Sequence, residues 1–367
     1  MPKKLVLCLD GTSNRYSRDN TNVIKFLALL DKRAADQLVY YQPGIGTIMP
    51  PGVYNRIKNW FATRIDLAFA TLLKYHVQDA YSFLMRYYEE GDQIYFFGFS
   101  RGAYTARVLA GMLCKVGLLA RGNEELVPFA WDMYARLHND DEARGFRETF
   151  GRVVEVALIG LWDTVSSVGY LWQQHRFAYT FDNSIVRKVR HAISLDERRA
   201  YFRQNTWKEP PWPGQDVLQV WFPGVHCDVG GGYVEAQSGL SKSALAWMVG
   251  EVGGELAFRQ AAWTVVMPQV NSAQYVAPCA TATAHESLRG LWWLVELLPK
   301  RTRDPTDNYA VRWILPLGRR RQIFQVPSQA TYVHDSIERR LSAGIGYRPM
   351  NLPAGYTVVP TRPAITR

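Results

Sequence analysis

The chain has 367 residues, of which 47% are hydrophobic, and carries a formal net charge of +10. This length and composition allow a large buried core in one α/β domain or two. No run of eighteen apolar residues occurs, and the apolar stretch in "MPKKLVLCLDG" is too short for a signal peptide. We therefore expect a soluble protein, cytoplasmic by default, whose export would need a route without a signal peptide.

The four cysteines lie far apart and form no C-x-x-C pair, which argues against a disulfide framework and against a cysteine zinc site. The excess of positive charge favours an anionic partner, such as a nucleic acid or a phospholipid surface. No nucleic-acid-binding motif accompanies that charge, so we expect no nucleic-acid partner.

Short apolar runs alternate with helical patterns along the first two thirds of the chain. Helical periodicity is present in "VIKFLALLDK", over residues 57–90, and in a long stretch that begins near Arg101. The predicted strands lie in "KLVLCL", "QLVYYQPGIGT", "QIYFFGF", "RVVEVALIGLWDTVSSVG", "VRKVRHAISLDERRAYF" and "DVLQVWFPGVHCDVGGGY". This alternation predicts a mostly parallel central sheet with helices on both faces.

The alternation ends near residue 269, and we expect residues 269–330 to form a cap or insertion within a single domain that spans residues 1–367. In sheets of this kind, ligands bind at the carboxyl ends of the strands. The residues to examine for chemistry are therefore those just past each strand: Asp10, Ser100, Asp163, Asp196 and His226.

Gly98-Phe99-Ser100-Arg101-Gly102 matches the G-x-S-x-G pattern between a predicted strand and a predicted helix. Glycines on both sides of a serine allow the strand and the helix to pass close together, which exposes the serine on a strained turn. The alternative is a serine that caps the helix. We predict that Ser100 is a nucleophile, with oxyanion donors from the amide of Arg101 and from Gly11 or Thr12 after the first strand.

A serine nucleophile needs a base and a carboxylate that orients the base. Of the seven histidines, His226 follows the apolar run "VLQVWFPGV" and precedes Asp228 and three glycines, so we predict that it is the base. Two carboxylates qualify as the acid. Asp163 follows the first strand after the nucleophile, and Asp196 follows the second, where the acid of α/β hydrolases most often lies.

Together, "LDGTSN", "GFSRGAYTAR", "WDTVSSVG", "HAISLDERR", "GVHCDVGGGY" and "VHDSIERRL" resemble an uncharacterised α/β hydrolase family. That family contains the catalytic domain of type VI secretion phospholipase effectors. The resemblance runs from residue 5 to about residue 353. It implies an α/β hydrolase fold and release of fatty acid from phospholipid by a triad of Ser100, His226 and Asp163, with Asp196 as the alternative acid. Asp10, Gly98, Gly102 and Asp228 lie in the matching motifs as supporting residues.

The stretch "HESLRGLWWLVELLPKR" places Leu288, Leu291, Trp292, Val295 and Leu298 roughly on one helical face. A tryptophan-bearing helix beside basic residues suits contact with anionic lipid, because indole lies at the headgroup level and cations meet phosphates. We predict such contact through Trp292, Trp293, Lys300 and Arg301. The alternative is a helix that lines the acyl pocket.

Other functions fit the sequence less well. An aspartyl-phosphate phosphatase would need its nucleophile where Cys8 stands. His226 and Asp228 lack a third ligand, so we expect no metal and no cofactor. The remaining alternatives are a soluble carboxylesterase that acts on small or glycan-borne esters, and a relative that binds lipid or protein without catalysis.

Overall fold

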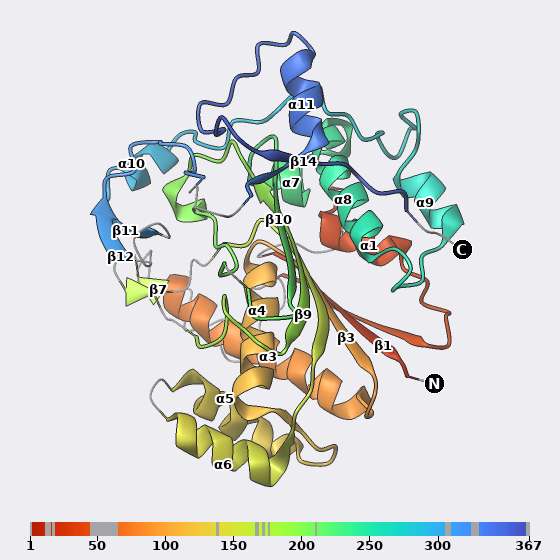
Figure 1. Ribbon diagram of the computed structural model, residues 1–367, viewed down its shortest axis with the longest axis vertical. Coiled ribbons are helices and arrows are strands. Elements are labelled where there is room, and N and C mark those ends of the chain that lie inside the picture. The colour runs from red at the N-terminus through yellow and green to blue at the C-terminus, as the bar shows by residue number, and fades with distance from the viewer. Residues whose placement is uncertain are drawn as a thin grey trace.

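A computed structural model of the chain contains an eight-stranded, all-parallel sheet with the order β14-β13-β10-β9-β6-β3-β1-β2 (Figure 1). Its strands are β1 (Lys4–Leu9), β2 (Gln37–Gln42), β3 (Gln93–Phe99), β6 (Val156–Trp162), β9 (Val186–Ser194), β10 (Asp216–Phe222), β13 (Tyr332–His334) and β14 (Thr357–Val359). The structure describes residues 2–11, 16, 19–44, 65–136, 139–165, 169–170, 173–174, 177–209, 211–304, 310–323 and 330–364.

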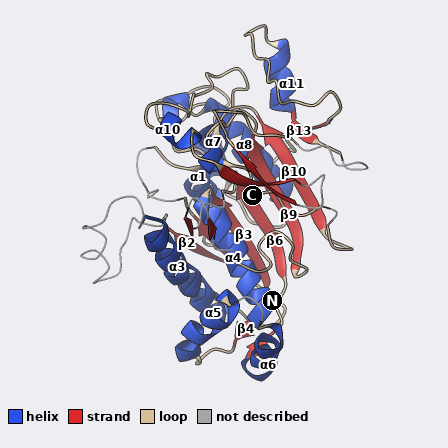
Figure 2. Ribbon diagram, turned by 90° about the vertical axis from the view of Figure 1, so that its left-hand side faces the viewer, coloured by secondary structure: helices blue, strands red, loops and turns tan. Residues whose placement is uncertain are grey.

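The six longest strands coincide with the six predicted apolar runs, so the predicted α/β fold with a parallel central sheet is confirmed. On one face of the sheet lie α3 (Ile65–Tyr87), α4 (Arg101–Val116), α5 (Val127–Ala135) and α6 (Asp140–Phe150). On the other face lie α1 (Asn22–Leu29), α8 (Gly239–Val252) and α9 (Gln260–Val266). Figure 2 shows α3 and α4 beside the strands of the sheet.

The strands supply side chains to both faces in turn because successive residues of a strand point to opposite sides. In β1, Leu5 and Leu7 belong to the apolar cluster that includes α3 and α4, whereas Val6 and Cys8 belong to the cluster that includes α1 and α8. A strand buried on both faces needs a continuous apolar run, which is what the sequence shows.

The carboxyl ends of the central strands meet at one edge of the sheet. Phe99 of β3 is in register with Trp162 of β6, and Trp162 is in register with Ala192, two residues before the end of β9. On the other side of β9, Ser194 is in register with Phe222 of β10. The residues that follow these strands are therefore neighbours in space, although the chain separates them widely.

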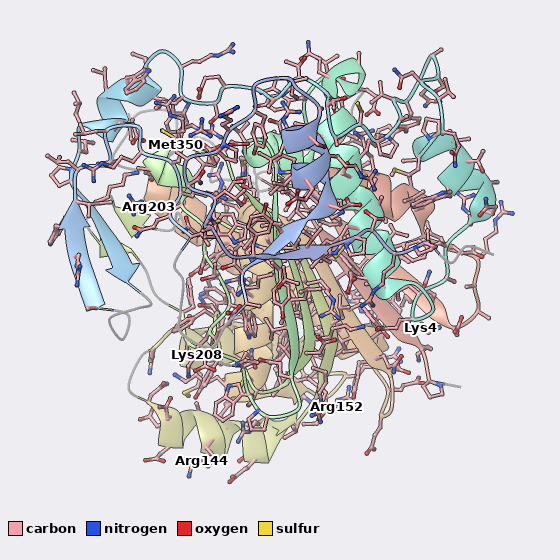
Figure 3. All side chains as sticks on the ribbon, turned by 45° about the horizontal axis from the view of Figure 1, so that its top comes forward. Lys4, Arg144, Arg152, Arg203, Lys208 and Met350 are labelled. Atoms are coloured by element: carbon pink, nitrogen blue, oxygen red, sulfur yellow. The ribbon has the colours of Figure 1, made fainter. Side chains whose placement is uncertain are left out.

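The segment expected as a cap holds α10 (Trp292–Glu296) and an antiparallel pair of strands, β11 (Lys300–Asp304) and β12 (Ala310–Ile314). The helix is shorter than the sequence predicted. Gly290 adopts a φ of 57° before α10, and Pro299 follows it, which leaves five helical residues. Figure 3 shows Met350 and Arg203 on the side of the molecule that carries β11 and β12, and Arg144 at the bottom of the view.

Beyond residue 330, β13 and β14 extend the central sheet past β10, and α11 (Asp335–Ser342) connects them in the chain. The sequence analysis did not predict these two edge strands. The remaining elements are α7 (His226–Gly230), η1 (Glu124–Leu126), η2 (Ala200–Phe202), η3 (Glu235–Gln237) and the short paired strands β4 (Leu118–Leu119), β5 (Gly151–Arg152), β7 (Gly169–Tyr170) and β8 (Gln173–Gln174). Within the described ranges, every helix is too short or too polar to cross a bilayer.

Candidate active site

Ser100 occupies the turn between β3 and α4 with φ 58° and ψ −122°, a conformation that non-glycine residues rarely adopt. A Cβ atom at Gly98 would lie 2.7 Å from the backbone of Ala103, and one at Gly102 would lie 2.2 Å from the carbonyl oxygen of Leu9. Neither position can carry a side chain without moving the backbone. The two glycines therefore allow the strained turn that presents Ser100 at the edge of the sheet.

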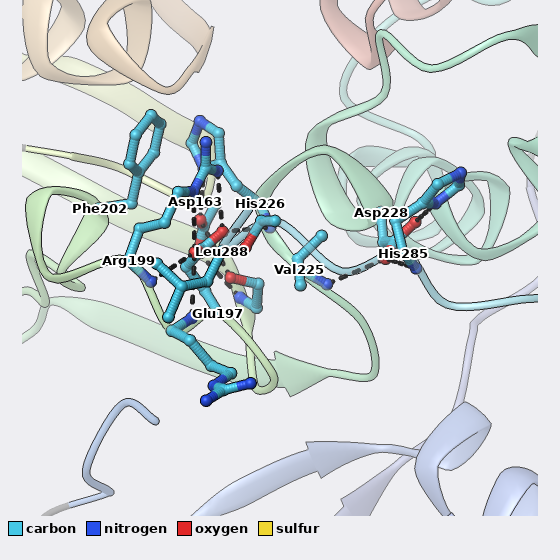
Figure 4. Close-up of polar contacts among 12 residues, drawn as sticks. Asp163, Glu197, Arg199, Phe202, Val225, His226, Asp228, His285 and Leu288 are labelled. Atoms are coloured by element: carbon cyan, nitrogen blue, oxygen red, sulfur yellow. Dashed lines mark hydrogen bonds and ion pairs between the residues drawn. The ribbon is translucent and has the colours of Figure 1, made fainter. Parts of the chain in front are cut away.

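His226 is the first residue of α7 and lies beside Ser100. Its Nε2 is 2.8 Å from Ser100 Oγ. Its Nδ1 is 2.5 Å from Oδ2 of Asp163, and both of these residues are labelled in Figure 4. The ring is buried and packs against the aromatic rings of Phe99 and Phe202, with centroids 4.6 and 4.8 Å away. A neutral imidazole with its proton on Nδ1 satisfies both contacts: it donates to the carboxylate and accepts from the serine hydroxyl.

Asp163 directly follows β6 and has a φ of 42°. Its carboxylate is fully buried and accepts hydrogen bonds from the amide of Ser194 at 2.8 Å and from the hydroxyl of Ser194 at 3.1 Å. Both of its oxygens also contact the guanidinium of Arg321. The unusual backbone conformation at Asp163 is thus supported by bonds to the next strand and to a distant loop.

The charges around this pair determine its protonation states. Burial would raise the pKa of Asp163, but Arg321 and the hydrogen bond from His226 hold that pKa well below its usual range. Burial lowers the pKa of His226, and the Asp163 charge opposes this only in part. At neutral pH the site therefore holds a neutral imidazole beside an ionised carboxylate, the state in which the histidine can accept a proton.

Asp196, the alternative acid, points elsewhere. Its carboxylate accepts from the amide of Gly224 at 2.7 Å, from the hydroxyl of Tyr347 at 2.8 Å and from Arg320 at 2.6 Å. The described contacts of His226 do not include Asp196. Asp196 holds the turn that precedes α7, and burial raises its pKa.

Three residues were proposed as oxyanion donors. Arg101 begins α4 directly after Ser100, so its amide lies in the first turn of that helix. The amide of Gly11 donates to Oδ1 of Asp10 at 2.7 Å. This amide therefore already has an acceptor within its own turn. The other oxygen of Asp10 accepts from the hydroxyl of Thr21 at 2.9 Å. Thr12 lies outside the described residues.

Glu197 and Arg321 belong to the site and were not predicted. Glu197 is fully buried and accepts from the amide of His226 at 3.2 Å, from Ser287 at 2.7 Å and from Arg199. Burial would raise its pKa, but the bonds from Arg199 lower it to about 2. The ion pair joins Glu197 to the guanidinium of Arg199, two residues further along the chain, at 2.9 Å.

Asp228 lies two residues after His226 and joins α7 to His285, in the segment that the sequence predicted as a cap. Its Oδ1 is 2.6 Å from Nδ1 of His285, while its Oδ2 accepts from the amides of His285 and Val225 at 3.0 Å each (Figure 4). Asp228 thus supports the turn that carries His226. Within the described part of the chain, no three His, Cys, Asp or Glu side chains are grouped as metal ligands.

The four residues predicted to contact a membrane lie in different surroundings. Trp293 is exposed, but Trp292 is half-buried and packs edge-on against Phe202, with centroids 5.6 Å apart. Lys300 is buried with its Nζ 4.3 Å from the centroid of the Tyr201 ring, so its prediction as a headgroup contact is wrong. Burial lowers the pKa of Lys300 to about 8. The side chain of Arg301 lies outside the described part of the structure.

Comparisons with known proteins place the chain in a family. The model of the family "T6SS, Phospholipase effector Tle1-like, catalytic domain" matches residues 3–251, more than half of the chain. A protein of Saccharomyces cerevisiae, "Uncharacterized protein YEL023C", is 41% identical over 228 residues, which are 57% of this chain and 33% of that protein. The chain therefore spans only about a third of the length of this relative.

Two solved structures are also similar. An uncharacterized protein from Pseudomonas aeruginosa matches with a TM-score of 0.42 and 20% identity, over 75% of this chain and 49% of that one. The Tle1 effector bound to the VgrG spike of the type VI secretion system matches with a TM-score of 0.36 and 22% identity, over 64% of this chain and 51% of that one. On the strength of the family match, the chain belongs to the family of Tle1-like phospholipase effector catalytic domains.

Proposed function

We propose that this protein is a serine ester hydrolase that cleaves fatty-acyl esters of phospholipids, as a phospholipase A does. The observation that carries the proposal is the hydrogen-bonded series Ser100–His226–Asp163 at the carboxyl edge of the sheet, with distances of 2.8 and 2.5 Å. A hydroxyl, an imidazole and a carboxylate in this order make up the machinery of acyl transfer. Membership of a phospholipase family supports the lipid substrate.

In the proposed mechanism, Ser100 Oγ attacks the carbonyl carbon of the ester while its proton passes to Nε2 of His226. The carbonyl oxygen becomes an oxyanion beside the N-terminus of α4, where the amide of Arg101 is the proposed donor. The intermediate then expels the alcohol, which takes the proton from His226. A water molecule, deprotonated by the same imidazole, then attacks the acyl carbon. The bond to Ser100 Oγ breaks, the imidazolium returns its proton to that oxygen, and the fatty acid is released.

The surroundings of His226 suit this chemistry. The rings of Phe99 and Phe202 contact the imidazole, which is buried, and the exclusion of water strengthens its hydrogen bonds to Ser100 and Asp163. Burial also keeps the imidazole neutral in the resting state, so it is ready to accept the serine proton.

An exposed apolar surface lies near the proposed site, and we propose that it meets the lipid. We call it the α10 surface. Its members share large, exposed apolar side chains in the cap: Leu291, Trp293, Leu294, Leu297, Trp313, Leu315 and Leu317. Trp292 lies within this segment and contacts Phe202, which contacts His226.

The test is fatty-acid release from anionic phospholipid vesicles, measured beside turnover of a short-chain p-nitrophenyl ester, with wild type and Ser100→Ala. Release from vesicles that Ser100→Ala loses by several orders of magnitude would support the phospholipase. Turnover of the short ester alone would replace the phospholipase with a soluble carboxylesterase. Equal, background rates in both proteins would refute a hydrolase and favour a relative that only binds.

The α10 surface has its own test. Trp293→Ser should slow release from vesicles and leave turnover of the soluble ester unchanged, because it alters only contact with the interface. The matched control is Trp212→Ser, a half-exposed tryptophan in the loop before β10, which should change neither rate. Equal loss on both substrates with Trp293→Ser would refute a role at the interface.

A further inference from the structure

The guanidinium of Arg321 makes an unusually complete set of contacts with the proposed acid. Its Nη1 and Nη2 contact the two oxygens of Asp163, the second at 2.9 Å. Nη1 also donates to the hydroxyl of Ser194 at 2.8 Å, and Nε donates to the carbonyl oxygen of Phe202 at 3.0 Å. The side chain is buried, with 2% exposure, so these bonds are not shared with water.

The backbone around Arg321 is fixed as well. Arg321 lies in the loop after β12, where its amide donates to the carbonyl oxygen of Glu197 at 3.3 Å. The side-chain amide of Asn351 donates to the carbonyl oxygens of Arg321 and Leu195, at 2.9 and 2.8 Å. Both Arg321 and Asn351 lie beyond residue 251, where the match to the family's catalytic domain ends. The segment after the matched region therefore completes the surroundings of the proposed acid.

We propose that Arg321 is a positioning residue of the catalytic acid: it fixes the orientation of the Asp163 carboxylate and limits the affinity of His226 for a proton. This inference rests on the proposed function. A planar guanidinium bound to both carboxylate oxygens leaves the carboxylate little freedom to rotate. One oxygen is thereby held toward Nδ1 of His226.

The charges support the second half of the proposal. The charged and titratable groups near His226, from every described element around it, are Asp163, Glu197, Arg199, Cys227, Asp228 and Arg321. Glu197 is paired with Arg199, and Asp163 is paired with Arg321. When His226 takes the serine proton, the Asp163–Arg321–His226 group gains a net charge of about +1, which the new oxyanion balances. Protonation without an oxyanion has no such balance and is disfavoured.

The charge of Arg321 determines the direction in which its removal should change the pKa of His226. Arg321 repels the imidazolium, so its removal raises the pKa of His226. Neutral imidazole is the reactive form, and the acid limb of the pH profile of kcat/KM should move to higher pH. For Arg321→Met we expect a shift of about one pH unit. At the alkaline plateau we expect kcat/KM to fall about 10- to 100-fold, because the carboxylate is no longer held in place.

The experiment compares wild type, Arg321→Met, Arg321→Lys and the control Arg319→Met on a soluble short-chain ester between pH 4 and 9. Arg321→Lys keeps the charge but lacks the planar pair of N–H groups that bonds to both carboxylate oxygens at once. It should therefore lower kcat/KM and shift the acid limb of the pH profile only slightly. Arg319 is exposed in the same loop, and its replacement should change neither quantity. If Arg321→Met folds and the acid limb of its kcat/KM profile lies at the same pH as in wild type, the inference is overturned.

An NMR titration of the His226 ring, assigned by loss of its signal in His226→Ala, measures the same pKa without turnover. If wild type hydrolyses no ester, the proposed function fails, while the titration still decides whether Arg321 limits protonation of His226. If Arg321→Met does not fold, Arg321→Lys decides: kcat/KM equal to wild type would show that the two-oxygen contact has no role.

Discussion

Replacing Asp163 by asparagine separates the two candidate acids. The carboxylate of Asp163 accepts bonds from His226, from the amide and hydroxyl of Ser194, and from both terminal nitrogens of Arg321. Asparagine keeps one acceptor oxygen and turns the other position into a donor. If the amide nitrogen faces Ser194, it meets a donating N–H. If it faces His226, the imidazole must accept at Nδ1 and carry its proton on Nε2.

In that second tautomer Nε2 cannot accept the proton of Ser100, so the nucleophile loses its base. We expect kcat/KM to fall about 10⁴-fold, which corresponds to about 5.4 kcal/mol of transition-state stabilisation. The substitution also leaves Arg321 buried without a counter-ion, at a cost of about 3–5 kcal/mol of stability. The rate must therefore be referred to the folded fraction, measured by circular dichroism in the same buffer.

Asp196→Asn is the matched control. It removes a buried carboxylate that bonds to Gly224, Tyr347 and Arg320 but does not contact His226. We expect the free energy of unfolding to fall by about 1–3 kcal/mol and kcat/KM of the folded protein to change little. The reverse pattern, with Asp196→Asn inactive and Asp163→Asn close to wild type, would refute the assignment of the acid.

Two further predictions concern stability. Gly102→Ala should destabilise the fold by about 1–3 kcal/mol or more, since its Cβ would lie 2.2 Å from the carbonyl oxygen of Leu9; Gly145→Ala, on α6 with open space around it, should instead stabilise slightly in the same urea titration. Glu197 has a folded pKa of about 2 against 4.5 unfolded, so its contribution of about 3 kcal/mol is present above pH 4.5 and lost as pH falls toward 2. Glu197→Gln should lower the free energy of unfolding at pH 7 and flatten its decline between pH 4.5 and 2; an unchanged slope would contradict this.

The sequence predicted those parts of the fold that local patterns encode. Six apolar runs predicted six strands because strands buried on both faces need such runs. The strands β13 and β14 have three residues each, "YVH" and "TVV", which are too short to show a period. β13 pairs with the edge of β10, and β14 pairs with β13, so both strands depend on the tertiary structure and not on a local pattern.

The candidate site also has residues that local sequence predicts and residues that it does not. The turn around Ser100 was predicted because glycines two residues before and two after it encode the geometry locally. Asp163 and Asp196 could not be told apart from spacing, since both end neighbouring strands and only the conformation of each turn directs the carboxylate. Arg321 could not be predicted at all: it lies 158 residues from Asp163, and no pattern in the sequence joins the two.

The long separations within the site have a consequence for folding. Ser100 and His226 are 126 residues apart, Asp163 and His226 are 63 apart, and Arg321 is 158 from Asp163. Loops of this length close only after much of the chain has collapsed, because the conformational entropy of the loop is lost before the contacts between its ends can form and stabilise the structure. During refolding, helical circular dichroism should recover first and hydrolytic activity last. The rate at which turnover recovers would then measure the rate of the final step of folding.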